Sequence, residues 1–285
     1  GLLGVVTEVT VKLLPRPPET RVVLAAFNEV AAAAEVVSNI IGQGLLPAGL
    51  EMMDRLAIQA AEDFVHAGYP REAEAILLCE VDGTGAEVEA NVAMVTRIAQ
   101  AGGAFALQVA STAAEQANLW RGRKAAFPAV GRLTPDYYCM DGTIPRGELA
   151  NTLQRIAELA AEFDLAVANV FHAGDGNLHP LILYDASIAG QLERAEALGG
   201  RILELCVDVG GTVTGEHGVG VEKLDQMCRQ FNSAELEQFA RLKSSFDPTG
   251  VLNPGKAIPT LTRCAELGGM HVNGGREPFA KLERY

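Results

Sequence analysis

Two histidines bracket a short glycine-rich segment near the middle of the chain. The segment Phe171–His179 reads FHAGDGNLH, with His172 and His179 on either side of Gly-Asp-Gly-Asn. Glycine adopts positive φ readily, and Asp and Asn side chains bond the local backbone, so this sequence is typical of a tight turn. Apolar runs precede it, over 165–170, and follow it, over 178–183. A strand, a turn and a returning strand would bring both imidazoles together at one edge of a sheet.

A second polar segment, Gly215–Gly220, reads GEHGVG and adds Glu216 and His217. Two histidines and one carboxylate form a three-ligand set that suits a divalent metal and leaves one coordination position open. We therefore predict His172, His179 and Glu216 as metal ligands. The alternative stays open that the histidines are only hydrogen-bonding groups of structural turns.

The composition narrows the class of protein. The 285 residues, 48% hydrophobic and 21% charged, are typical of a globular protein with one large domain or two modest ones. Lys and Arg total 23 against 36 Asp and Glu, a net charge of −13, which disfavours nucleic acid and anionic membrane as partners. No apolar run reaches the roughly 18 residues of a transmembrane helix, and we expect no signal peptide.

The five cysteines are dispersed along the chain and form no CxxC pair. This pattern predicts reduced thiols in a cytoplasmic protein, and it argues against a disulfide scaffold and against an iron–sulfur site. The cysteines are Cys79, Cys139, Cys206, Cys228 and Cys264.

Strand and helix patterns alternate along most of the chain. Residues 1–14 alternate apolar and polar side chains and predict a strand, which the proline-rich linker 15–18 ends. From 19 to 209 some strands follow one another directly, which favours an α+β domain with a ferredoxin-like antiparallel sheet covered by helices. Residues 210–285 show mainly helix and loop patterns and predict a separate C-terminal segment.

Several element limits follow from caps, breakers and periodicity. Asn28 is a candidate cap for a helix that ends near Gly42, and Pro145 suits the first turn of another helix. The predicted helices include Glu29–Ile41, Ala86–Ala101, Thr112–Ala125, Pro145–Phe163, Ser187–Val209 and Ser233–Phe246, and Tyr137–Ile144 is predicted as one strand.

Three motifs occur in the order FHAGDGNLHP, GEHGVGVEK and FDPTGVLNPGK. Together they resemble the C-terminal half of the FAD-linked 2-hydroxyacid oxidases and dehydrogenases, flavoproteins of the vanillyl-alcohol-oxidase type. The segment WRGRKAAFPAVGRLTPDYYCMDGTIPRGEL and the tail NPGKAIPTLTRCAELGGMHV are more similar still to the FAD-linked subunits of bacterial glycolate oxidases. The resemblance extends from Gly1 to the C-terminus.

The resemblance implies that the chain is part of a longer protein. Residues 1–18 would be the last strand of the FAD-binding domain and a linker, 19–209 the substrate (cap) domain, and 210–285 a segment that returns to the flavin domain. The first residue is Gly1 and not Met, which fits this expectation. FAD would be bound mainly by the missing N-terminal domain.

The implied reaction is hydride transfer to FAD from the α-carbon of glycolate or of a small D-2-hydroxy acid such as D-lactate. His172, His179 and Glu216 match the metal ligands of metal-containing relatives, whose ion is most often zinc, and the two histidines would contact the substrate. His217 matches the residue proposed there as base, and a pKa near 6.5 suits an imidazole to that task. Arg123 matches the arginine that binds the substrate carboxylate.

The same family comparison bears on several other residues. Asn253 and Lys256 belong to the LNPGK motif that approaches the flavin. Asp175 is a candidate to orient one of the histidines. Arg121 and Lys124, the neighbours of Arg123, could be solvent-facing alternatives to it, and the interpretation that all three form a solvated helix face stays open. Cys139 stands where relatives acting on longer diacids carry a lysine, which favours a small monoacid.

Partners and alternatives follow from the same comparison. The related subunits work with a second flavin-type subunit and an iron–sulfur subunit, so we expect a cytoplasmic complex, with peripheral attachment to the inner membrane through those partners. A second hypothesis is a stand-alone metal-dependent hydrolase or lyase that uses His172, His179 and Glu216 with His217 as base. A third is a non-catalytic assembly subunit in which these loops are structural turns only.

Overall fold

The computed structural model describes residues 1–260 and residue 264. The chain divides into two compact units. The larger unit is Pro15–Gly211, and the second combines Gly1–Leu14 with Thr212–Tyr285. In the described part of the chain, no helix is long and apolar enough to span a bilayer.

The roles assigned to the ranges 1–18, 19–209 and 210–285 stay predictions. The division into two compact units does not show which cofactor or substrate each one binds. Of the predicted C-terminal segment, residues 261–263 and 265–285 lie outside the described residues.

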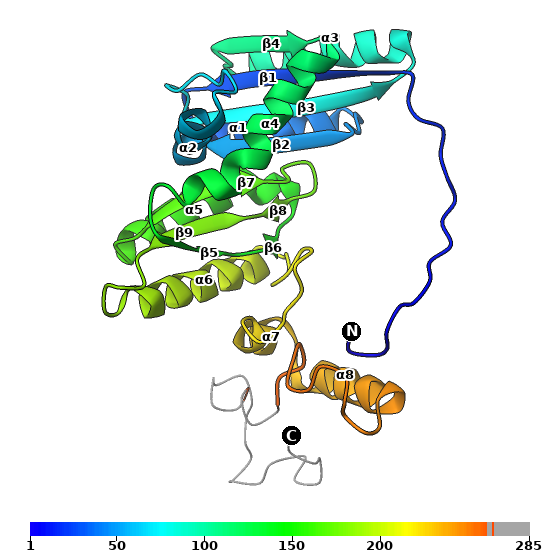
Figure 1. Ribbon diagram of the computed structural model, residues 1–285, viewed down its shortest axis with the longest axis vertical. Helices are drawn as coiled ribbons and strands as arrows, with labels where there is room; N and C mark the ends of the chain where they lie inside the picture. The colour runs from blue at the N-terminus through cyan, green and yellow to red at the C-terminus, as the bar shows by residue number, and fades with distance from the viewer. Residues whose placement is uncertain (261–263, 265–285) are drawn as a thin grey trace. The chain divides into compact units, whose positions relative to one another are not determined.

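The larger unit is built on a β-sheet whose strands are not arranged in chain order. All of its paired strands are antiparallel. Seven strands form the main sheet in the order β4-β1-β3-β2-β7-β9-β5, and β6 and β8 form a two-stranded sheet (Figure 1). This arrangement confirms the predicted α+β class with an antiparallel sheet. The strands are β1 (Glu19–Phe27), β2 (Gly49–Asp54), β3 (Ala75–Gly83), β4 (Ala106–Ala110), β5 (Asp136–Cys139), β6 (Gly142–Thr143), β7 (Ala166–Phe171), β8 (Asn177–Leu178) and β9 (Pro180–Tyr184).

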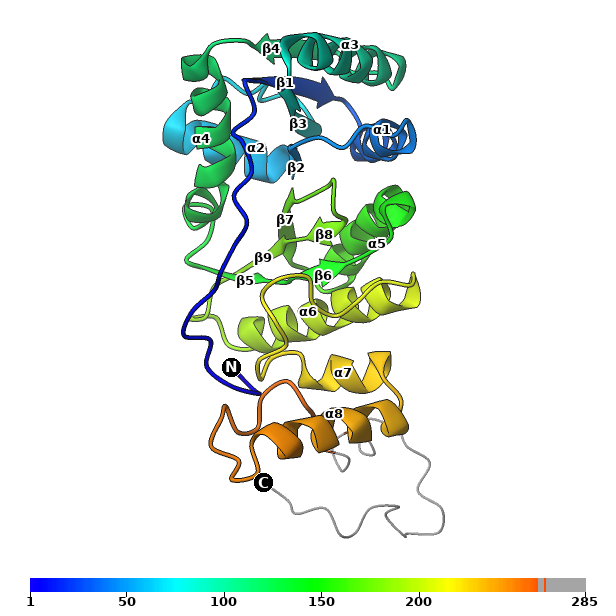
Figure 2. The same ribbon diagram turned by 90° about the vertical axis from the view of Figure 1, so that its right-hand side faces the viewer.

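Helices cover both faces of this sheet. Figure 2 shows α1, α3 and α5 on one side and α2 and α4 on the other. Strand side chains alternate between the faces, so β1 contributes Val23 and Phe27 to one core and Val22 and Leu24 to the other. The helices of this unit are α1 (Val30–Gly42), α2 (Arg55–Val65), α3 (Gly85–Ala101), α4 (Ala113–Val130), the 3-10 turn η1 (Arg146–Glu148), α5 (Leu149–Glu162) and α6 (Gln191–Asp208).

Helix α4 carries the predicted site residue Arg123, and the sequence of the helix explains where it lies. Thr112 and Glu115 form a capping box at its start. Gly122 lets it approach closely, because a Cβ atom there would lie 2.6 Å from the ring of Tyr69. The helix continues past the predicted end at Ala125 and includes Pro128, so the tertiary packing of its last turn outweighs the cost of an interior proline.

Some element limits differ from the sequence-based predictions. The strand expected over Tyr137–Ile144 is divided into β5 and β6. The Met140 N–H still bonds the Pro180 carbonyl, in continuation of the β5–β9 register, and the chain then leaves β9 to pair with β8. The helix expected from Pro145 begins as a 3-10 turn. Asn28 is not the cap of α1, since Glu29 occupies the N-cap position without a side-chain bond.

The strand predicted over residues 1–14 has no counterpart among the described strands. A strand is stabilised by hydrogen-bonding partners on a neighbouring strand, and no described residue pairs with this segment in a sheet. Its apolar side chains are largely exposed, with Val5 at 78% and Val9 at 72%. Alternation of apolar and polar residues was therefore not sufficient to predict a paired strand here.

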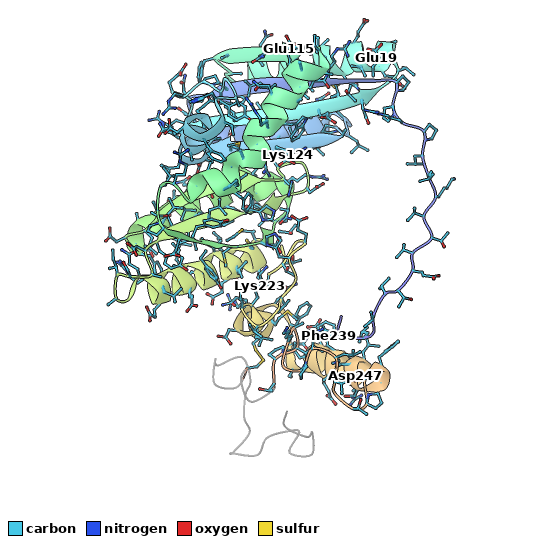
Figure 3. All side chains as sticks on the ribbon, viewed as in Figure 1. Glu19, Glu115, Lys124, Lys223, Phe239 and Asp247 are labelled. Atoms are coloured by element: carbon cyan, nitrogen blue, oxygen red, sulfur yellow. A yellow bond between two sulfur atoms is a disulfide. The ribbon has the colours of Figure 1, made fainter. Side chains whose placement is uncertain are left out.

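The second unit contains α7 (Leu224–Gln230) and α8 (Ser233–Phe246), which confirms that the C-terminal segment is mainly helical in its described part. Figure 3 shows Phe239 on α8 and Asp247 at the end of that helix. The Asp247 carboxylate accepts bonds from the N–H groups of Val251 and Leu252 and pairs with Lys243, whose ammonium lowers the pKa of that carboxyl. These bonds fold the FDPTGVLN turn.

The prediction that all cysteines are reduced thiols is wrong for two of them. Cys228, on α7, forms a disulfide with Cys264. The two residues are 36 positions apart, and only the fold brings them together. Dispersed spacing therefore did not exclude a disulfide. Cys79, Cys139 and Cys206 remain reduced.

Candidate functional site

Three strands of the larger unit direct polar side chains to the sheet face that α4 covers. In the register of β2 and β7, Met53 lies opposite Val170, and two positions along Glu51 lies opposite His172. The Val170 N–H donates to the His179 carbonyl, which places His179 opposite Val170 across β7 and β9. Side chains alternate along a strand, so these three polar residues share the face on which Met53 and Val170 pack.

The two histidine rings lie together, as the strand–turn–strand pattern predicted. Their centroids are 5.1 Å apart, and their planes are nearly perpendicular, at 87°. His179 is 1% exposed, whereas the His172 side chain is 35% exposed. One ring is thus fixed within the protein, and the other is accessible from solvent.

The turn between the histidines is anchored to two other segments. The Gly174 N–H donates to the Leu50 carbonyl at 2.9 Å, and the Gly176 carbonyl accepts from the Ile144 N–H at 2.9 Å. Gly176 has a φ of +72°, and a Cβ atom there would lie 2.2 Å from the Ile144 carbonyl oxygen. Only glycine fits this position, so the turn has one geometry and holds the His172 backbone beside β2.

Glu51 bridges two of the predicted site residues. Its Oε1 lies 2.8 Å from Nδ1 of His172. Its Oε2 accepts from Nε of Arg123 at 3.0 Å and lies 2.8 Å from Nη2 of the same guanidinium. The Glu51 and Arg123 side chains are only 12% and 9% exposed. A buried carboxylate needs such partners, and here they are an arginine and a histidine.

The surroundings of His179 differ from those of His172. Nδ1 of His179 is 3.4 Å from the Met140 carbonyl oxygen and 4.0 Å from Oδ1 of Asp141, which is fully buried. The Phe127 ring of α4 meets the imidazole edge-on, with centroids 6.0 Å apart. Polar groups near Nδ1 and an aromatic ring alongside fix the orientation of this side chain.

The three cationic neighbours on α4 differ in exposure, so they do not form one solvated helix face. Arg123 points into the sheet face and is buried, whereas Arg121 and Lys124 are exposed. Figure 3 shows Lys124 on α4. Arg121 donates to the Val65 carbonyl and to Asn118, which are surface contacts. Helical periodicity therefore gives only Arg123 access to the histidines.

Asp175 does not orient a histidine, contrary to the prediction. It is exposed in the turn, and its backbone N–H bonds the His172 carbonyl. Nδ1 of His172 is contacted instead by Glu51, which comes from a strand more than 100 positions earlier. A signal was present in the sequence, because a glutamate inside the apolar strand LEMM requires a partner.

Glu216 and His217 belong to the second unit, where both are exposed in the loop before α7. Within that loop Nε2 of His217 is 4.0 Å from Oε1 of Glu216. Lys223, from the same GEHGVGVEK motif, is buried, and its Nζ lies 3.3 Å from the Thr214 hydroxyl. The functional roles of Glu216 and His217 stay predictions from the sequence.

The LNPGK turn is also in the second unit. Asn253 has a φ of +47°, and its Nδ2 donates to the Gly1 carbonyl at 2.9 Å. The Lys256 ammonium is 3.3 Å from Oδ1 of Asn253. Both side chains are exposed, which would leave them accessible to a cofactor, and their role in FAD binding stays a prediction.

Comparison with known proteins decides the family. The family model described as FAD linked oxidases, C-terminal domain, matches residues 16–257, which is most of the chain. The chain belongs to this family. The FAD linked oxidase match contains all seven predicted site residues, from Arg123 to Lys256.

Curated relatives carry the same domain within longer chains. The glycolate oxidase subunit GlcD of Escherichia coli strain K12 is 60% identical over 285 residues, all of this chain and 57% of that protein. GlcD of Bacillus subtilis strain 168 is 39% identical over 256 residues, 90% of this chain and 54% of that protein. The mitochondrial D-lactate dehydrogenase [cytochrome] of Arabidopsis thaliana is 30% identical over 261 residues, 91% and 46%. The chain spans about half the length of these relatives.

A solved structure confirms the fold. A p-cresol methylhydroxylase structure with substrate bound superposes with a TM-score of 0.64 at 15% sequence identity, over 87% of this chain and 54% of that one. At this identity the likeness concerns the fold alone. It shows that the FAD linked oxidase fold persists where the sequence has diverged.

The donor chemistry of the site suits the groups that this family implies. Two imidazoles on one face, with Nδ1 of one ring bonded to a carboxylate, form the kind of donor pair that divalent metals use. His172 and His179 therefore fit the predicted metal. Glu51 and Asp141, which contact or approach their Nδ1 atoms, were not predicted.

Proposed function

We propose that the protein containing this chain is an FAD-dependent oxidoreductase that converts glycolate or a small D-2-hydroxy acid such as D-lactate into the 2-oxo acid. This chain would supply the substrate-binding domain. The observation that carries the proposal is the cluster in which Arg123 of α4 contacts Glu51, and Glu51 contacts His172, which lies beside His179 on the sheet face that α4 covers. The relatives named as glycolate oxidase subunits and D-lactate dehydrogenase support the substrate class.

The reaction removes a hydride from the α-carbon and a proton from the hydroxyl group of the substrate. FAD, when bound, accepts the hydride. Arg123 would bind the substrate carboxylate, because a planar guanidinium can donate hydrogen bonds to both carboxylate oxygens. Glu51 contacts Nε and Nη2 of Arg123, so the substrate would meet the remaining edge, which includes Nη1.

His172 and His179 would hold a divalent metal, with Glu216 as the predicted third ligand. Such an ion, when bound, draws electron density from the substrate hydroxyl and makes its proton more acidic. His217 would take that proton, since a neutral imidazole is available near neutral pH. The support for Glu216 and His217 is the GEHGVG motif alone.

The size of the substrate follows from Cys139. This residue ends β5. By the resemblance to the 2-hydroxyacid dehydrogenases, it would lie about where relatives that act on longer diacids carry a lysine for the second carboxylate. The Cys139 thiol lies 3.4 Å from the Met140 carbonyl oxygen. A thiol is neutral, whereas a lysine ammonium is positively charged. A diacid would therefore lack a counter-charge here, which favours glycolate and D-lactate.

The whole protein would act with partners. Two of the relatives are named as a subunit of glycolate oxidase, which supports a complex. We propose a second flavin-type subunit and an iron–sulfur subunit as the partners that pass the electrons on. A cytoplasmic location, with peripheral attachment to the inner membrane through these partners, remains part of the same proposal.

The test uses the full-length protein that contains this chain, with its FAD. Oxidation of glycolate, D-lactate and a longer 2-hydroxy diacid is followed with an artificial electron acceptor, and metal content is measured by plasma mass spectrometry. We expect turnover of the two monoacids, about one divalent metal per chain, and loss of both in His172→Ala/His179→Ala. His66→Ala, which changes an exposed histidine at the end of α2, should behave as wild type.

Other outcomes would select another hypothesis. Turnover of an ester, or dehydration of a hydroxy acid, without FAD would favour a metal-dependent hydrolase or lyase. Absence of bound metal in the wild-type protein, together with unchanged activity of the double histidine variant in the full-length complex, would favour a non-catalytic assembly subunit.

A further inference from the structure

We propose that Glu51 is a positioning residue that fixes the His172 ring for metal binding and the Arg123 guanidinium for substrate binding. The inference rests on the proposed function, and it concerns a residue outside the motifs that suggested that function. Glu51 is the group that connects the predicted metal ligand and the predicted carboxylate-binding residue, through 2.8 Å contacts to both.

The backbone around Glu51 is rigid and belongs to the centre of the sheet. Strand β2 pairs with β3 on one side and β7 on the other, so its main chain has partners on both sides. The loop that carries His172 is tied to the same strand, since the Gly174 N–H bonds the Leu50 carbonyl. The Glu51–His172 distance is therefore set by sheet register and by a backbone bond next to Glu51.

The contact with Nδ1 determines which ring atom of His172 can bind a metal. A carboxylate accepts hydrogen bonds, so the imidazole must carry its proton on Nδ1 when it bonds Glu51. The metal must then use Nε2. A carboxylate behind a metal-binding histidine also makes the ring a stronger ligand, and changing such partners typically weakens metal affinity about 10- to 100-fold.

The contact with Arg123 has a second consequence. One Glu51 oxygen serves the guanidinium and the other serves the imidazole, so neither side chain can turn without disturbing the other. Both members of the ion pair are largely buried, which makes a rearrangement costly. The carboxylate therefore couples the position of the metal ligand to the position of the substrate-binding cation.

The test compares Glu51→Gln with Glu62→Gln in the full-length protein. Glu62 is a second buried glutamate of the same unit, and its Oε1 accepts from the Tyr69 N–H, away from the histidines. Zinc affinity is measured by competition with a chromophoric chelator, and KM and kcat are measured with glycolate. We expect Glu51→Gln to weaken zinc binding about 10- to 100-fold and to raise KM, while Glu62→Gln retains wild-type zinc affinity and KM.

A charge-conserving variant separates position from charge. Glu51→Asp keeps the carboxylate but shortens its reach, so it should recover part of the zinc affinity lost in Glu51→Gln. If Glu51→Gln does not accumulate as folded protein, the pair Arg123→Met and Arg123→Met/Glu51→Gln replaces it. Without the guanidinium the carboxylate charge is not needed for folding, and the double variant should still bind zinc more weakly than Arg123→Met.

The outcomes distinguish the two proposals. Wild-type zinc affinity and KM in Glu51→Gln, or equal losses in Glu51→Gln and Glu62→Gln, would overturn the role of Glu51 and leave the proposed function standing. A wild-type protein that neither binds zinc nor oxidises a 2-hydroxy acid would overturn the proposed function, and the role of Glu51 with it.

Discussion

Oδ2 of Asp54 accepts two hydrogen bonds from Asn169, one from its backbone N–H and one from its Nδ2, each 2.8 Å long. Oδ1 of Asp54 accepts from the Ala57 N–H and so caps α2. A single carboxylate thus joins the end of β2, the start of α2 and strand β7. Desolvation by burial raises the pKa of Asp54 from 3.8 to about 6, although these bonds oppose the shift.

The raised pKa of Asp54 predicts a specific dependence of stability on pH. The folded state favours the protonated carboxyl, so the stabilising contribution of this group is full below its unfolded pKa of 3.8 and is lost as pH rises through about 6. A shift of roughly two pKa units corresponds to about 3 kcal/mol. The free energy of unfolding of wild type, relative to Asp54→Asn, should therefore fall between pH 4 and pH 6.

The measurement is urea unfolding followed by fluorescence of Trp120, the single tryptophan, which reports on the larger unit. Asp54→Asn also alters the cap of α2, which adds an offset but no titration. The control is Asp63→Asn, because Arg71 lowers the pKa of exposed Asp63 and its contribution must instead decline as pH falls. A wild-type advantage over Asp54→Asn that is constant, or grows from pH 4 to pH 6, would contradict the prediction.

Two glycines with positive φ test how the histidine turn is held. Gly176 (φ +72°) and Gly44 (φ +81°) would both be strained by a side chain, but only Gly176 is crowded, by the Ile144 carbonyl. We expect Gly176→Ala to lower the free energy of unfolding by about 1–3 kcal/mol more than Gly44→Ala, because overpacking adds to the same backbone strain. Urea unfolding monitored at Trp120 measures both; equal losses would show that the turn can move away from Ile144.

The part of the site that the sequence predicted correctly is the part whose residues lie close together along the chain. The histidines of FHAGDGNLH are joined by one turn between two apolar runs, so their proximity could be inferred from strand alternation. Glu51 could not be assigned to His172 in the same way, because their contact depends on the register of β2 against β7. Register is a property of the whole sheet, and a glutamate in an apolar strand indicates only that some partner exists.

The fold shows the same division between local and non-local information. The helix predicted from Thr112 does begin there, since the capping box of Thr112 and Glu115 makes only local bonds. The interruption after β5 accompanies a change of partner strand from β9 to β8, and the Cys228–Cys264 disulfide depends on two distant segments. Neither the interruption nor the disulfide leaves a local sequence pattern.

Arg123 and Arg121, two residues apart and so on nearly opposite sides of α4, give a matched pair for the substrate-binding role. In the full-length protein Arg123→Gln should raise KM for glycolate about 10- to 100-fold, because a hydrogen bond to a charged group contributes roughly 1.5–3 kcal/mol. It should also lower the free energy of unfolding by about 3 kcal/mol, since the buried Glu51 carboxylate loses its cation. Steady-state kinetics measures the increase in KM. Urea unfolding followed by Trp120 fluorescence measures the loss of stability of the larger unit, which contains Trp120.

The control for Arg123→Gln is Arg121→Gln. Arg121 is exposed and donates only to Val65 and Asn118, so this variant should keep the wild-type KM and lose less than about 1 kcal/mol of stability. A similar KM increase in both variants would show that the helix, and not the Arg123 guanidinium, matters for substrate binding.

The thiols can be ranked by reactivity from their positions. Cys139 is half-buried, whereas Cys79 and Cys206 are buried, and burial raises the pKa of Cys79 to about 12. The reactive species is the thiolate, so iodoacetamide should modify Cys139 first in the native chain. In denaturant without reductant this chain should bind three labels, and five after reduction of the Cys228–Cys264 disulfide. Peptide mass spectrometry counts the labels; five labels before reduction would mean that Cys228 and Cys264 are not joined in the protein.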